Sequence, residues 1–157
     1  NARINVSIGG SLLATLNTAS EYGFGAVIAS LPGFKALNAG IASAIRDPLV
    51  NEAVTVTTLA GITGSASGGM SIALASMSEM YLEQAAKLGI SPEVLHRVAS
   101  MASGGMDTLP HNGAVITLLA ITGLTHRQSY GDIFAMTVIK TISVFLIIAV
   151  YYLTGIV

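Results

Sequence analysis

Residues 98–125 read VASMASGGMDTLPHNGAVITLLAITGLT, and this stretch decides how the rest of the chain is interpreted. It is apolar except for Asp107 and His111. Its middle, residues 104–113, holds two glycines, a proline and then an Asn-Gly pair, which a regular helix cannot accommodate. Each flank alone is too short to span a bilayer, whereas the two flanks together are long enough. The sequence therefore predicts one discontinuous transmembrane helix over 98–125.

The composition of the whole chain is typical of a membrane protein. Hydrophobic residues make up 52% of the 157 residues and charged residues only 10%, whereas soluble domains carry about 25% charged residues. The formal net charge of -1 offers no electrostatic footprint for nucleic acid, and the absence of cysteine excludes disulfides. Because the chain starts with Asn1 and shows no targeting segment, we expect a piece of a longer protein. The predicted fold class is all-α, in a polytopic membrane protein.

Two other segments are long enough to cross a membrane. Residues 133–157 are apolar apart from Lys140 and predict a transmembrane helix. Residues 48–88 begin behind a helix-start signal, an Asp N-cap followed by proline, and predict a second one. The glycine-rich middle of that segment, residues 61–69, is interpreted as a loosened stretch or as a face of close helix packing, with packing favoured.

Two shorter segments are expected at the membrane surface or partly inside it. Residues 92–100 gather their apolar side chains on one face, which is typical of an interfacial helix. Residues 4–34 consist of two apolar runs on either side of a polar, glycine-rich stretch at 17–25. This pattern predicts a re-entrant hairpin, whose non-helical tip must lie inside protein or beside a water-filled cavity. The alternative for the tip is a water-exposed loop of capping residues.

Asp107 and His111 are the most informative candidate functional residues. An ionisable group in a spanning segment is costly and usually functional, and histidine titrates near neutral pH. The functional interpretation is a substrate site with a proton-responsive group. The alternative is an ion pair or a cap that only stabilises the helix break. Glu21, in the expected hairpin tip, is a third candidate for proton coupling.

Three stretches carry a resemblance to a known family: NTASEYGFGAVIASLPGF at 17–34, LAGITGSASGGMSIAL at 59–74 and ASGGMDTLPHNGAVITLLAITGLT at 102–125. Together they resemble the C-terminal region of the gluconate permease family, the gluconate:proton symporters. That family is similar in plan to the ion-transporter superfamily, in which each of two inverted repeats has a re-entrant hairpin and a broken helix. The resemblance implies that this chain is most of the second repeat of a multi-pass protein of the inner cell membrane.

The resemblance also implies an activity and a site. The activity is proton-coupled uptake of a small organic acid by alternating access, the acid being gluconate or a related sugar acid, glycerate or a hydroxy acid. The implied hairpin tip and helix break meet at the substrate. The implied substrate-binding residues are Asn17, Thr18, Ala19, Ser20, Thr108, His111, Asn112 and Gly113, and those for proton coupling are Asp107, His111 and Glu21.

The expected partners follow from this interpretation. They are a small carboxylate substrate, the lipid bilayer, the N-terminal repeat of the same protein and, as a further option, a second copy in a homodimer. No cofactor, metal or catalytic residue is expected, the proton serving as the coupling ion. Half-helix N-termini bind a carboxylate without Arg or Lys, which suits a segment with few basic residues.

Two rival functions come from other classes. One is a membrane-embedded enzyme that uses His111 and Asp107 as an acid–base pair or as metal ligands. One His and one Asp are too few for a closed metal site. The other is a non-transporting structural subunit, and ionisable groups at a helix break argue against it.

Overall fold

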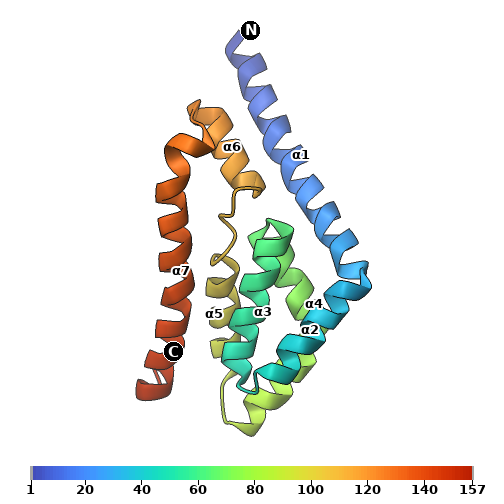
Figure 1. Cartoon of the computed structure of the whole chain (residues 1–157), viewed down its shortest axis with the longest axis vertical. Coiled ribbons are helices and arrows are strands. Elements are labelled where there is room, and N and C mark those ends of the chain that lie inside the picture. Colours follow the sequence, from blue (N-terminus) through green and yellow to red (C-terminus); the bar gives the residue numbers. More distant parts are fainter. Residues whose placement is uncertain (1, 157) are drawn as a thin grey trace.

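Helices make up nearly all of the chain (Figure 1). The computed structural model describes residues 2–156, except for the side chains at positions 2, 3, 18, 21, 22 and 25. Every regular element within this part of the chain is a helix, as the sequence predicts. The helices are α1 (Ala2–Ser30), α2 (Pro32–Ala44), α3 (Pro48–Thr63), α4 (Ala66–Lys87), α5 (Pro92–Ser103), α6 (Gly113–Thr122) and α7 (His126–Thr154).

The chain reverses sharply between α3 and α4. Helix α3 ends at Gly64, which has a positive φ of 66°. Ser65 then caps α4 by accepting a hydrogen bond from the Gly68 N–H. A left-handed glycine followed at once by a capping serine ends one helix and begins another. The single helix predicted over 48–88 is therefore wrong, because two antiparallel helices occupy that range (Figure 1).

The two arms of this hairpin approach each other very closely at one glycine. A Cβ atom at Gly69 would lie 2.3 Å from the backbone nitrogen of Ala60, so a side chain does not fit there. The packing interpretation of the glycine-rich stretch is confirmed at this position. The apolar core lies between the helices of this hairpin and their neighbours. Its most deeply buried side chains include Leu49, Ala53, Val56, Leu59, Ala73 and Tyr81.

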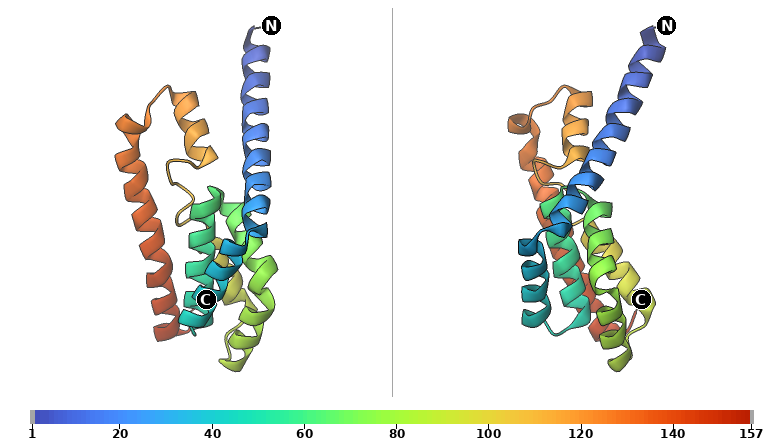
Figure 2. Two further views of the ribbon diagram at one scale, coloured as in Figure 1. Left: turned by 45° about the vertical axis from the view of Figure 1, so that its right-hand side comes forward. Right: turned by 90° about the vertical axis from the view of Figure 1, so that its right-hand side faces the viewer.

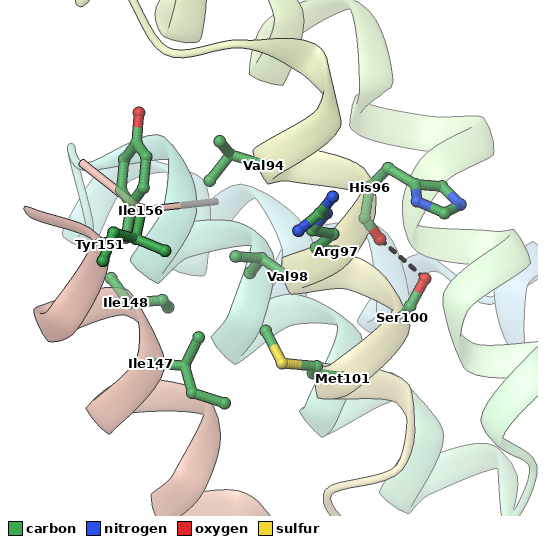
Figure 3. A pocket seen from close by; sticks show the side chains of 10 residues that line it. All are labelled: Val94, His96, Arg97, Val98, Ser100, Met101, Ile147, Ile148, Tyr151 and Ile156. Carbon is green, nitrogen blue, oxygen red and sulfur yellow. Dashed lines mark hydrogen bonds between the residues drawn. The ribbon is translucent and has the colours of Figure 1, made fainter. Parts of the chain in front are cut away.

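Helix α5 packs its apolar face against the hairpin. Val94 and Val98 on that face are only 4% and 2% exposed, and both belong to the core. The interfacial helix predicted over 92–100 is therefore wrong in its surroundings, because protein and not a membrane surface covers the apolar face. Helix α7 lies on another side of α5, and an apolar groove of about 360 Å³ runs between them (Figure 3).

The helix interruption predicted at 104–113 is present. Helix α5 stops at Ser103, and α6 starts at Gly113 after an irregular segment. The two halves run in the same general direction, and α7 then returns along the bundle (Figure 1). This part of the fold follows from the Gly-Gly, Pro and Asn-Gly signals in the sequence.

The hairpin predicted over 4–34 is wrong. Helix α1 continues without interruption through 17–25, and α2 bends away beyond it without turning back (Figure 2). Pro32 sets the break, because proline disfavours the helical region for the residue before it. Leu31 accordingly adopts an extended backbone with ψ of 140°. Asn, Ser and Gly lower helix propensity within 17–25, but unlike proline they do not forbid the helix.

Of the described helices, α7 is the one that is long and apolar enough to cross a membrane by length and composition. It begins before the expected residue 133, because the Gln128 side chain accepts a hydrogen bond from the Thr125 N–H at 2.9 Å and caps the first turn. Large apolar side chains on α1, α6 and α7 remain exposed, among them Val6, Leu16, Ile121, Ile139 and Leu146. Exposed apolar surface of this extent is typical of faces that lipid or further protein covers.

Candidate functional site at the hairpin tip and the helix break

The tip of the α3–α4 hairpin lies against the irregular segment between α5 and α6. The Nε2 atom of His111 is 2.9 Å from the carbonyl oxygen of Gly61. A carbonyl oxygen can only accept, so Nε2 carries the hydrogen in this contact. The amide of Asn112 donates to the carbonyl oxygen of Gly64. The break thus supplies donors to two carbonyl groups at the end of α3, those of Gly61 and of its C-cap Gly64.

Asn112 holds this junction from both sides. Its side chain is buried, at 2% exposure, and its Oδ1 atom accepts a hydrogen bond from the Ala114 N–H at 2.7 Å. The same side chain therefore caps α6 and ties the break to the hairpin tip. Because Ser65 caps α4 next to Gly64, the N-termini of α4 and α6 meet at one place. Each N-terminus carries partial positive charge, so the junction is suited to an anion.

Asp107 and Thr108 turn toward α7 instead. The Oδ1 atom of Asp107 is 2.7 Å from Nζ of Lys140, with the two side chains 25% and 32% exposed. The hydroxyl of Thr108 is 2.6 Å from that of Thr137. The ion pair that the sequence allowed as the alternative role of Asp107 is therefore present. Among the residues that the structure describes, no three His, Asp or Glu side chains gather in a way that could hold a metal ion.

An open cavity of about 500 Å³ lies beside His111 and is lined by Pro110, His126, Arg127 and Tyr130 as well. The Nε2 atom of His126 is 2.9 Å from the carbonyl oxygen of Pro110. The Arg127 guanidinium supplies a positive charge at this opening, while both imidazoles direct Nε2 to backbone carbonyl oxygens. Sequence reasoning singled out neither His126 nor Arg127 and missed this grouping. The short apolar run of α6 could have indicated this grouping, because a short helix keeps the start of α7 near the helix break.

Helix α1 reaches the site through Asn17. The amide of Asn17 donates to the hydroxyl of Thr117 on α6 at 3.1 Å. Ala19 and Ser20 lie exposed on α1 and form part of a helix, not a hairpin tip. The side chains of Thr18 and Glu21 lie outside the described residues, so their roles stay predictions.

Sequence reasoning also missed where the hairpin tip is and one buried acid. The hairpin tip lies at 63–69, between α3 and α4. There the Gly64–Ser65 pair combines a residue that ends a helix with a residue that begins one. The acid is Glu52 on α3, which is 1% exposed. The sequence could have drawn attention to Glu52, because it is the sole charged residue from 48 to 78.

Comparison with known proteins adds a relative with a functional name. The chain is 69% identical over 154 residues to a protein of Bacillus subtilis (strain 168) named "Uncharacterized transporter YxjC". That relative is named as a transporter. The match covers 98% of this chain and 33% of the relative, so the chain spans about a third of its length. No family model matches the chain, and no solved structure matches it.

Proposed function

We propose that this chain is part of a membrane transporter for a small organic acid, and that the acid binds where the hairpin tip meets the helix break. The observation that carries the proposal is the contact of Asn112 with Gly64, which joins two helix N-termini at one point. The name of the Bacillus subtilis relative supports the same class of function.

The chemistry of the junction favours a carboxylate. The first N–H groups of α4 and α6 that the Ser65 and Asn112 side chains do not cap would provide donors, and Arg127 would attract anions to the adjoining cavity. Of the side chains predicted to bind substrate hydroxyls, Asn17 on α1 would do so, because Thr108 faces α7 and Asn112 already bonds Gly64 and Ala114. Gluconate or a related sugar acid, glycerate and a hydroxy acid all combine a carboxylate with hydroxyls, and they are the proposed substrate class.

The proposed mechanism is proton-coupled alternating access. The hairpin and the broken helix bind the acid, and the N-terminal repeat of the same protein completes the site from the other side. Asp107, His111 and Glu21 are the coupling candidates that the sequence predicts. An acid–base pair of an enzyme would need Asp107 and His111 to reach one substrate, yet they contact α7 and α3 respectively, and this favours transport.

Uptake by the full-length protein in proteoliposomes tests the proposal. The assay measures entry of labelled gluconate, glycerate and 3-hydroxybutyrate, with glucose as a neutral control and empty liposomes as a blank. We expect saturable entry of at least one acid and no entry of glucose. Absence of entry for every acid, or equal entry of glucose, would contradict the proposed function.

A further inference from the structure

Glu52 lies in the second turn of α3 and is almost completely buried. Its side chain is 1% exposed, and its Oε2 atom has no hydrogen-bond partner. The ion pairs of the described residues are Lys87 with Glu83 and Lys140 with Asp107, and Glu52 belongs to neither. An ionised carboxylate that is buried without a counter-charge is strongly unfavourable.

The polar neighbours of Glu52 are committed to one another. The hydroxyl of Tyr81 donates to Oδ1 of Asn51 at 3.2 Å, as does the hydroxyl of Thr55. The amide of Asn51 donates to the carbonyl oxygen of Ile45 at 2.8 Å. This network joins Asn51, Thr55 and Tyr81 and leaves Glu52 outside it.

Glu52 faces a cavity that reaches the surface between α4 and α5. The cavity has a volume of about 240 Å³, and its polar lining consists of Glu52, Ser78, Tyr81, His96 and Ser100. A water molecule takes about 30 Å³ of the liquid, so the cavity has room for several. His96 is exposed, and Figure 3 shows its ring on the side of α5 turned away from α7.

The titratable groups around this cavity can be named element by element. Among the residues that the structure describes, they are Tyr81 from α4 and His96 from α5, and no described lysine or arginine lines the cavity. Lys35 lies at a separate cavity on the α2 side of α4, and Arg97 lies in the groove between α5 and α7. The lining of the cavity therefore offers Glu52 no permanent cation.

We propose that the carboxyl of Glu52 is a proton-binding site that exchanges protons with the surface through this cavity. The proton passes from the His96 imidazolium or from hydronium, along water, to Oε2, and leaves a neutral imidazole or water and an uncharged carboxyl. A second part rests on the proposed function: this proton is the one coupled to transport. Asp107 differs from Glu52 because Lys140 already neutralises its charge.

Infrared spectroscopy of the purified full-length protein tests the proton site without any substrate. A protonated carboxyl gives a C=O stretching band distinct from that of a carboxylate. We expect a band that titrates with pH in the wild type, is lost in Glu52→Gln and is kept in Glu79→Gln, which removes an exposed carboxyl of α4. Should Glu52→Gln not fold, Glu52→Asp should shift the band. A band that Glu52 substitutions leave unchanged, or no such band, overturns the proposal.

Proteoliposome assays test the coupling. Coupling of one proton supports about tenfold accumulation for a pH difference of about one unit. With labelled gluconate, glycerate and 3-hydroxybutyrate, Glu52→Gln should exchange acid across the membrane as the wild type does but lose accumulation driven by the pH gradient. Glu79→Gln should retain both.

The two failures can be told apart. If the wild type takes up none of the acids, the proposed function fails, while the infrared result still decides the proton site. If Glu52→Gln accumulates acid like the wild type, the coupling role is overturned although transport stands. The same uptake assay is repeated with a sodium gradient in place of the pH gradient, because Na⁺ can also neutralise a carboxylate. Accumulation that follows sodium and not pH would overturn the assignment to a proton.

Discussion

Replacing Gly69 with alanine should force apart the two arms of the α3–α4 hairpin. The added Cβ would lie 2.3 Å from the nitrogen and 2.5 Å from the Cα of Ala60. Non-bonded heavy atoms sit about 3.5–4.0 Å apart, so α4 must retreat by about 1 Å. The obstacle is backbone and not a flexible side chain, so local adjustment of a rotamer cannot relieve it.

The expected energy follows from two opposing effects. Overpacking in a well-packed core costs about 1–3 kcal/mol, and a clash with backbone belongs at the upper end. The better helix propensity of alanine returns about 1 kcal/mol. We therefore expect Gly69→Ala to lower the free energy of unfolding by about 2 kcal/mol.

Unfolding of the purified full-length protein in detergent, followed by circular dichroism, measures this effect. The matched control is Gly131→Ala in α7, because a Cβ at Gly131 would meet nothing within 4 Å. The control should leave stability unchanged or raise it slightly. If Gly69→Ala proves as stable as the control, the close contact of α3 with α4 is refuted.

Four further substitutions test the site and its surroundings. Asn112→Ala removes a helix cap and the donor to Gly64, and should destabilise the full-length protein by about 1–3 kcal/mol in the same unfolding assay. Lys140→Met and Asp107→Asn should each destabilise the protein, and the double variant by less than their sum, with a coupling energy of about 0.5–3 kcal/mol. Tyr81→Phe loses one buried hydrogen bond and should cost about 0.5–1.5 kcal/mol.

Each of these expectations has its own control. Asn112→Ser keeps a neutral oxygen for the cap but loses the amide donor to Gly64, so it should fall between wild type and Asn112→Ala. Additive effects of Lys140→Met and Asp107→Asn would show that the two side chains do not interact. Tyr152→Phe removes a surface hydroxyl that donates to Asp47, and a larger loss there than for Tyr81→Phe would contradict the buried network.

Local signals in the sequence predict the helix break correctly, because residues 104–113 contain several residues that disfavour helix. The cap was not predicted: Asn112, expected only as a substrate-binding residue, caps α6. The distance between Asp107 and its ion-pair partner, Lys140, is 33 positions, and no local pattern links them. The sequence could offer the ion pair only as an alternative.

The misplaced hairpin has a physical explanation. Polar residues and glycines at 17–25 weaken a helix by small increments, which other interactions offset. At 64–65, in contrast, a left-handed glycine and a capping serine act on the same turn and reverse the chain. A count of polar residues and glycines places the chain reversal at 17–25. Residues that end and begin helices place it at 64–65, where the structure has it. Glu52 was missed because its burial arises from α4 and α5, which sequence spacing does not reveal.

Substrate protection of a single cysteine shows directly whether the acid binds where the hairpin tip meets the helix break. Ser67 lies exposed in the first turn of α4, beside the proposed anion site, and Ser43 lies exposed on α2. In a full-length protein otherwise free of cysteine, Ser67→Cys and Ser43→Cys are labelled with a maleimide, with and without the acid that the protein takes up. We expect the acid to slow labelling at position 67 and to leave labelling at position 43 unchanged. Equal labelling rates at position 67 with and without the acid would contradict a substrate site at the hairpin tip and the helix break.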